Sequence, residues 1–143
     1  MKKSINIPKL FVIGFFGLGF AVFVAKVFQP ETEANNVKVS MTDLSEEAKS
    51  GQLLFDNNCA ACHGVNASGT DKGPPLVHDI YNPGHHPDEA FYGAVANGVS
   101  QHHWPFGNMP KQNQVTADEV TKIVRYVREM QLANGITYKP HKM

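Results

Sequence analysis

The sequence predicts an all-α globular domain that follows an N-terminal apolar helix. Three observations predict this architecture: a continuous apolar run at residues 10–28, later segments that begin with helix-capping spacing, and no segment whose alternation would suit a sheet. The chain of 143 residues suffices for one compact domain with an appendage. Thirteen basic residues balance thirteen acidic ones, which argues against nucleic acid as a partner.

Residues 1–28 are predicted to form a membrane anchor. As a helix, the apolar run would span about 28 Å, which matches the hydrocarbon core of a bilayer. Lys2, Lys3 and Lys9 precede the run, so the positive-inside bias places the N-terminus in the cytoplasm and the rest of the chain outside. A cleaved signal sequence, whose apolar region is usually shorter, is the alternative for residues 1–34.

The segment at residues 29–40 is expected to be a flexible linker, because it contains proline, glutamate and asparagine and has no helical or strand periodicity. Residues 41–143 then form the globular domain. Nine basic and thirteen acidic side chains follow residue 28, which gives this part a net charge of −4. A basic docking face therefore cannot be assumed.

The globular domain is expected to begin with a helix. Asp43 and Glu46 have the spacing of a capping box, and helix-forming and apolar residues continue to Phe55. Residues 64–87 are rich in glycine, proline, asparagine and aspartate. This composition predicts a loop rather than a long regular element.

Two further helices are expected after this loop. A short one starts after Pro87, because proline and acidic residues suit a first helical turn, and it stops at Gly98. Residues 99–114 are again predicted to be a loop. Thr116 and Glu119 repeat the capping-box spacing, and apolar residues at helical intervals then predict a last helix.

The segment Cys59-Ala60-Ala61-Cys62-His63 is the attachment signature of a c-type haem. Its two thiols can each form a thioether to a vinyl group of one porphyrin, and the adjoining histidine can reach the iron. A thioredoxin-like pair would need a βαβ context, a zinc site would need a second ligand pair, and a disulfide would leave the histidine unexplained. We therefore expect one covalent haem c per chain.

Around this motif the sequence resembles the class I mono-haem cytochromes c of bacteria. The first helix matches the family pattern at Gly51, Phe55 and Cys59, and the last helix matches it at Ile123 and Tyr126. In the family, the glycine lets the two helices cross closely. The resemblance implies the class I cytochrome c fold, with about three to four short helices around one covalently attached haem.

The resemblance also covers the segment Gly73-Pro74-Pro75-Leu76. In the family this loop follows the haem motif, and the proline carbonyl accepts a hydrogen bond from the ligand imidazole. The resemblance therefore implies that Pro74 orients His63 and that Leu76 belongs to the haem site. Such a bond would fix the tautomer of His63 and raise its donor strength.

The sixth iron ligand is expected to be Met109. It precedes Pro110 and stands 46 residues after the motif histidine, where the family takes this ligand from a Met-Pro pair before the last helix. His102 or His103, or an open position, remain alternatives. Met130 falls on the apolar stripe of the last helix, where methionine is more often core filler than ligand.

Trp104 and two pairs of histidines have more than one interpretation. In small bacterial members of the family, a tryptophan five residues before the methionine donates its indole N–H to a haem propionate. Trp104 stands at that offset and either has this role or is a plain core aromatic. His85-His86 and His102-His103 are either exposed loop histidines or ligands of a second metal such as copper.

These expectations combine into a membrane-tethered electron carrier rather than an enzyme. With histidine and methionine on the iron, no coordination position remains for a substrate. We expect electrons to pass between respiratory-chain or periplasmic redox partners, with the domain on the periplasmic or extracellular side of the bacterial inner membrane. A haem enzyme or gas sensor with a displaceable sixth ligand is one alternative, and a copper-handling protein that uses the histidine pairs is another.

Overall fold

The computed structural model describes residues 19–20 and 37–140. The chain divides into two units, Met1–Glu33 and Ala34–Met143. The predicted anchor at residues 10–28 lies outside the described residues apart from 19–20, and so does the predicted linker apart from its last four residues. Within the described ranges, no helix is both long enough and apolar enough to cross a membrane.

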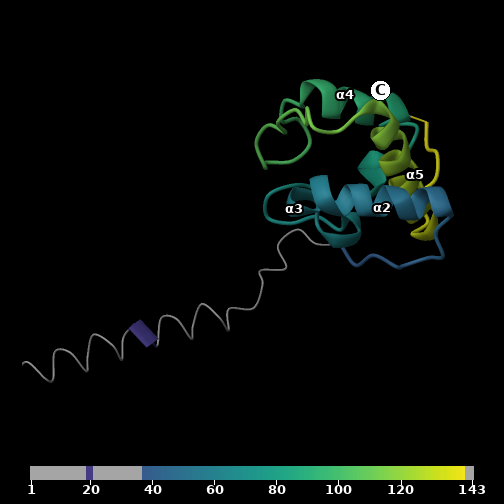
Figure 1. The fold of residues 1–143 in the computed structure, drawn as a ribbon, viewed down its shortest axis with the longest axis horizontal. Helices are drawn as coiled ribbons and strands as arrows, with labels where there is room; N and C mark the ends of the chain where they lie inside the picture. Colours follow the sequence, from purple (N-terminus) through teal and green to yellow (C-terminus); the bar gives the residue numbers. More distant parts are fainter. Residues whose placement is uncertain (1–18, 21–36, 141–143) are drawn as a thin grey trace, which may run out of the picture. The chain divides into compact units, whose positions relative to one another are not determined.

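The described part of the second unit is helical, as the sequence predicts (Figure 1). Its elements, in chain order, are α2 (Glu46–Asn58), α3 (Ala60–His63), η1 (Val65–Ala67), η2 (Asp79–Tyr81), α4 (Asp88–Asn97) and α5 (Ala117–Ala133), where η marks a 3-10 helix. No strand is formed by residues 37–140, and Val99 and Met109 make only an isolated antiparallel bridge. The three predicted helices are therefore confirmed as α2, α4 and α5.

The helix starts agree with the sequence for α5 but not for α2. Thr116 and Glu119 form the predicted capping box at the start of α5. The predicted cap of α2 is wrong, because Ser45 rather than Asp43 accepts the hydrogen bond from the Ala48 N–H, at 3.2 Å. Asp43 lies too far before the first helical residue to reach the open N–H groups of the first turn.

Helices α2 and α5 pack against each other (Figure 1), and Gly51 lies where they cross. A Cβ atom at Gly51 would stand 1.9 Å from the carbonyl oxygen of Lys122 and 3.1 Å from the backbone nitrogen of Ile123. Only glycine permits this approach. The rings of Phe55 and Tyr126, one from each helix, have their centroids 5.4 Å apart. The close crossing implied by the family resemblance is thus confirmed.

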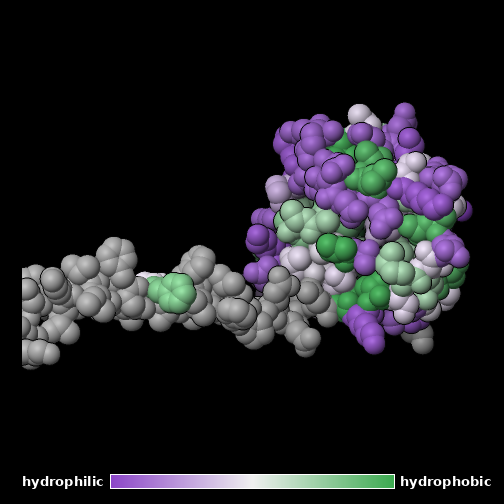
Figure 2. Space-filling model, turned by 60° about the horizontal axis from the view of Figure 1, so that its bottom comes forward, coloured by the Kyte–Doolittle hydropathy of each residue, from purple (hydrophilic) through white to green (hydrophobic). Residues whose placement is uncertain are grey.

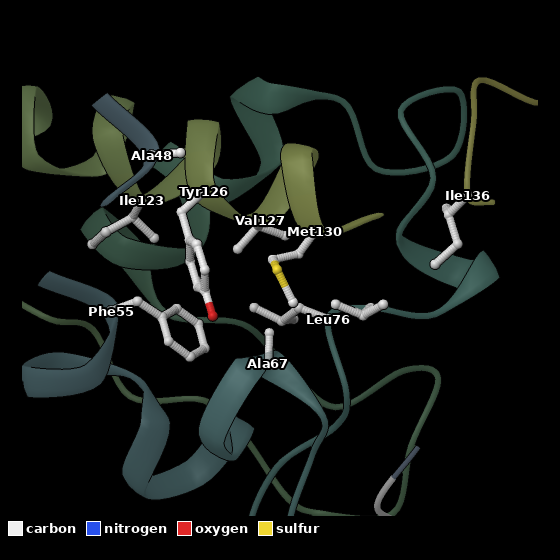
Figure 3. Packing of buried hydrophobic residues seen from close by; sticks show 10 residues of the cluster. Ala48, Phe55, Ala67, Leu76, Ile123, Tyr126, Val127, Met130 and Ile136 are labelled. Carbon is white, nitrogen blue, oxygen red and sulfur yellow. The ribbon is translucent and has the colours of Figure 1, made fainter. Parts of the chain in front are cut away.

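Side chains from both helices and from the loop between η1 and η2 form one core (Figure 3). Met130 and Tyr126 extend from α5 into this core, and both are fully buried. The interpretation of Met130 as core filler is therefore confirmed. Gln131 is also buried, and its amide donates to the carbonyl oxygens of Leu76 at 2.8 Å and Tyr81 at 3.0 Å. These two bonds fasten the long loop to α5.

Residues 37–40 pack on the same globule. The Val37 N–H donates to the carbonyl oxygen of Ser68 at 2.8 Å. Ser40 donates its N–H to the Asn134 side chain at 2.7 Å and accepts a bond from it at 2.9 Å. Val37 and Ser40 are therefore hydrogen-bonded to the globule.

The surface of the globule mixes polar and apolar residues. On the face drawn in Figure 2, hydrophobic residues are interspersed among hydrophilic ones. Leu53, Val65 and Leu132 are exposed apolar side chains from three different helices. Residues of this kind are common on monomeric proteins and do not by themselves indicate an interface.

Candidate haem-binding site

A cavity of about 240 Å³ opens between α2, α3, α4 and the loop that leads to α5. Its lining is mostly apolar. The structure brings all seven predicted haem residues to this one cavity: Cys59, Cys62, His63, Pro74, Leu76, Trp104 and Met109. They come from three separate stretches of the chain, residues 59–63, 74–76 and 104–109, which the fold brings together.

The two cysteines lie at the junction of α2 and α3. Cys59, with φ −121°, separates the two helices and is half-buried, whereas Cys62 is exposed. Burial, with a smaller contribution from the neighbouring Cys62, raises the pKa of the Cys59 thiol to about 11. Cys59 is therefore a neutral thiol at pH 7, unlike the reactive thiolate of a thioredoxin-like pair. This microenvironment disfavours the redox-pair alternative.

His63, the last residue of α3, has one ring nitrogen engaged. Its Nδ1 atom lies 2.9 Å from the carbonyl oxygen of Pro74. A carbonyl only accepts, so Nδ1 carries the proton and Nε2 keeps its lone pair. Burial lowers the pKa of His63, although the bond to Pro74 acts in the opposite direction. The neutral ring is the form that binds a metal ion.

Gly73 allows the proline loop to lie against the cysteine motif. A Cβ atom at Gly73 would stand 2.9 Å from the carbonyl oxygen of Cys62. The Thr70 hydroxyl donates a hydrogen bond to that same carbonyl group. These contacts keep the carbonyl of Pro74 within hydrogen-bond reach of His63.

Met109 is half-buried and enters the cavity from the loop before α5. Its backbone N–H and carbonyl bond to Val99 at 2.9 Å and 3.0 Å. Gly98, at φ 74°, ends α4 as predicted, and a Cβ atom there would stand 2.5 Å from the Met109 carbonyl oxygen. The Gln112 N–H also donates to the Val95 carbonyl at 2.8 Å. The end of α4 thus fixes the backbone on both sides of this methionine.

Trp104 carries a polar atom that needs a partner. Its Nε1–H is buried and has no hydrogen-bond acceptor among the described residues. Burial raises the pKa of Tyr81 to about 12, and the nearby indole of Trp104 partly opposes this increase. The indole Nε1–H nevertheless forms no hydrogen bond with the Tyr81 hydroxyl. A buried N–H without an acceptor is rare in native proteins. An anionic group in the cavity, such as a haem propionate, would satisfy it.

The cavity lining that α4 contributes was not predicted from the sequence. Ala90, Phe91, Ala94 and Val95 all line the cavity, and Tyr81 joins them from η2. The four α4 residues have the spacing of one apolar helix face. This spacing is the sequence signal from which they could have been predicted. No residue of α4 is fully buried by the protein's own side chains, so the apolar face of the helix is left to the cavity.

Both histidine pairs lie at the rim of the cavity. His86, His102 and His103 contribute to its lining. His85 joins them through its Nε2 atom, which lies 3.1 Å from Nε2 of His103. The fold therefore brings the two pairs together from separate loops.

The residues present fit a covalently attached haem. The cavity combines two thiols with an imidazole whose Nε2 is available, and it adds a thioether and a buried indole N–H. Cys59 and Cys62 would attach the porphyrin, and the apolar face of α4 would cover it.

The family comparison agrees with this fit. Residues 48–131 match the family model described as Cytochrome c. Among solved structures, the chain is similar to Cytochrome CL from the marine methylotrophic bacterium Methylophaga aminisulfidivorans MPT, with 26% sequence identity over 69% of this chain and 70% of that chain, and a TM-score of 0.48. No match was found among curated proteins.

Proposed function

Because the chain belongs to the cytochrome c family and binds haem c covalently, we propose that it is a membrane-tethered single-electron carrier with His63 and Met109 as axial ligands. When bound, the haem supplies one-electron exchange between ferric and ferrous iron. The protein's own side chains determine whether the iron can also bind oxygen or a substrate. Two side chains on the axial positions leave no open site for oxygen or a substrate.

The hydrogen bond from His63 Nδ1 to the Pro74 carbonyl is the observation that carries this proposal. A histidine that ligates a metal usually donates its other ring N–H to a carboxylate or a carbonyl, which fixes its tautomer. His63 has this arrangement and lines the same cavity as both motif cysteines. Its Nε2 lone pair would therefore be available to hold the iron of a bound haem.

Met109 supplies the other axial donor in this proposal. Its backbone is fixed by the bridge to Val99, so the side chain starts from a defined position at the cavity. A thioether ligand raises the reduction potential relative to two nitrogen ligands, and an apolar lining acts in the same direction. We therefore expect a high-potential carrier.

The apolar run at residues 10–28 supports a tether on the outer side of the bacterial inner membrane. A tether confines the carrier to the membrane surface, which raises its effective concentration near membrane-bound redox proteins. Its partners in this proposal are donors and acceptors of the respiratory chain or the periplasm. The net charge of −4 after residue 28 makes their association sensitive to salt.

The ligand assignment can be tested with Met109→Ala in the haem-loaded protein. We expect the wild type to show a low-spin spectrum with a sulfur-to-iron charge-transfer band, and the variant to lose that band and its high potential. Met130→Ala is the matched control, since it removes a buried methionine from α5 and should cost about 2–5 kcal/mol of stability without affecting the band.

Carbon monoxide separates the carrier from its alternatives. The reduced wild type should not bind it, whereas Met109→Ala should. Prompt binding by the wild type would instead favour an enzyme or a gas sensor. If the band survives in Met109→Ala, another methionine supplies the sulfur ligand. If the wild type lacks the band, the sixth ligand is not a thioether, and His102→Ala and His103→Ala test the histidine alternatives.

The tether is tested separately by expression of residues 1–143 and 29–143, the shorter form behind an unrelated cleavable signal sequence. The full chain should stay in the membrane fraction after washing with high salt and alkaline carbonate, and the shorter one should be released. A mature mass that lacks residues 1–34 would contradict the anchor and support a cleaved signal sequence.

A further inference from the structure

The histidines at the rim of the cavity have the geometry of a metal site. His85, His86 and His103 each offer a ring nitrogen, and these nitrogens all lie within 4.8 Å of one another. The Nε2 atoms of His85 and His103 are 3.1 Å apart. Two nitrogens on one tetrahedral ion, at about 2.0–2.1 Å from it, are separated by roughly 3.3 Å. This pair therefore already has nearly the spacing of two ligands.

We propose that His85, His86 and His103 bind a divalent transition-metal ion at the rim of the haem cavity, copper(II) more tightly than zinc(II). An all-imidazole set prefers these ions over magnesium or calcium, which prefer oxygen ligands, and copper binds such sets more strongly than zinc. Three protein ligands leave a fourth position for water or for a group from a partner.

The orientation of His86 supports this assignment. Its Nδ1 atom lies 2.7 Å from the carbonyl oxygen of Ile80, so Nδ1 donates and Nε2 is left to bind. This is the outer hydrogen bond that ligand histidines usually make. Burial is the main cause that lowers the pKa of His86. The neighbouring imidazoles also lower this pKa, whereas the hydrogen bond to Ile80 raises it.

The backbone of the first pair is held before any ion arrives. Both His85 and His86 donate their N–H groups to the carbonyl oxygen of Asn82, at 3.0 Å and 2.9 Å. The carbonyl of His86 accepts from Arg128 Nη2 at 2.6 Å. Arg128 is itself paired with Asp88 at 2.8 Å, so its charge is balanced next to the proposed cation site.

The loop that carries His103 is braced as well. The Gln101 N–H donates to the Asn108 side chain at 2.9 Å, and the Gly107 N–H donates to the Gln101 side chain at 2.7 Å. The ring of His102 lies beside that of His103, with centroids 4.3 Å apart and the ring planes tilted by 53°. An ion would therefore meet a braced site, which reduces the entropy lost on binding.

One proton has to move when the ion binds. In the present arrangement one Nε2 of the His85–His103 pair donates to the other. The donor ring would shift this proton to its own Nδ1, so that both Nε2 lone pairs face the ion. No net charge leaves the protein in this step, because the ring changes tautomer and stays neutral.

The test uses the haem-loaded protein in its ferric form, so that the iron cannot reduce the added copper. Zinc(II) is titrated by calorimetry, and copper(II) by electron paramagnetic resonance, in which bound imidazoles give nitrogen hyperfine splitting. The wild type should bind one ion per chain. His85→Ala and His103→Ala should each weaken binding at least about 100-fold, the upper range seen when only an outer-shell partner of a metal site is lost.

His78→Asn is the matched control. His78 lies outside the three-histidine set, and its Nδ1 accepts a hydrogen bond from the Ile80 N–H at 3.2 Å, a bond that an asparagine oxygen can replace. The control should bind zinc as the wild type does. An unchanged haem spectrum in every variant shows that all of them fold. Wild-type binding no tighter than that of His103→Ala, or equal losses in His78→Asn, would overturn the site while leaving the electron-carrier proposal intact.

Discussion

Glu129 in α5 accepts two hydrogen bonds from Ser45, one from its backbone N–H at 2.9 Å and one from its hydroxyl at 2.7 Å. Ser45 is also the N-cap of α2. A carboxylate in the last helix therefore holds the start of the first one. Arg125 completes the arrangement, with Nε 2.6 Å from the same carboxylate.

This arrangement predicts a pH-dependent contribution to stability. Burial alone would raise the pKa of Glu129, but the bonds from Ser45 and the pairing with Arg125 outweigh it, and the net pKa is lowered from 4.5. A lowered pKa means that the stabilisation is present above the unfolded pKa and is lost as the pH falls through the folded one. Glu129→Gln should therefore cost about 1 kcal/mol at pH 7.

Urea unfolding of the haem-loaded protein at pH 7 and at pH 3 checks this prediction. The difference between wild type and Glu129→Gln should shrink as the pH falls from about 4.5, where the unfolded carboxylate becomes protonated, through the lower pKa of the folded state. Glu47→Gln, an exposed change in the first turn of α2, should cost only a few tenths of a kcal/mol, roughly the scale of a surface substitution. A difference that stays constant with pH would show that charge is not the cause.

Gly51→Ala should weaken the crossing of α2 and α5. The added Cβ would meet the Lys122 carbonyl at 1.9 Å, so the two helices would have to separate. We expect a loss of about 1–3 kcal/mol in thermal or urea unfolding. Gly93→Ala is the control, since nothing lies within 4 Å of a Cβ at that helical position, and it should gain about 0.5–1 kcal/mol. Equal effects of the two changes would contradict the crossing.

Gly98→Ala should disturb Met109, the proposed sixth ligand. Gly98 has φ 74° and ψ 179°, a region nearly restricted to glycine, and the new Cβ would press on the Met109 carbonyl. We expect the sulfur-to-iron charge-transfer band to weaken. Gly107→Ala also replaces a glycine with positive φ, at 86°, but meets nothing within 4 Å. It should lose about 1–2 kcal/mol of stability and keep the band.

Trp104→Phe distinguishes a propionate donor from a plain core aromatic. If the buried Nε1–H bonds a propionate, its removal should cost about 1–3 kcal/mol, because the charged group loses a partner. If the N–H has no partner in the holoprotein, removing it should leave stability unchanged or increase it. Unfolding of the haem-loaded variants, followed by haem absorbance, gives the sign.

Much of the fold and the site was predictable because the signals are local. The start of α5 follows from Thr116 and Glu119, which lie one turn apart, and the haem motif is five consecutive residues. The crossing at Gly51 was predictable only through the family resemblance. A glycine by itself does not reveal which backbone will approach it.

The parts that the sequence did not reveal depend on contacts between distant segments. Ser45 caps α2 with support from Glu129, 84 residues away, and this favours it over the better-spaced Asp43. The meeting of His85 and His103 depends on two separate loops folding toward each other. Neither outcome leaves a periodic or spaced pattern in the sequence, which is why helix and turn rules could not predict it.

The bridge between Val99 and Met109 joins the two ends of the loop formed by residues 100–108. Length and side chains inside such a loop can vary at little cost in closure entropy, since each doubling costs only about 0.6 kcal/mol. Met109 is held at the end of the loop by the bridge, so its position should not depend on substitutions at His102, His103 or Trp104 within the loop. Natural variation or engineering can therefore change the rim of the cavity without moving the proposed iron ligand.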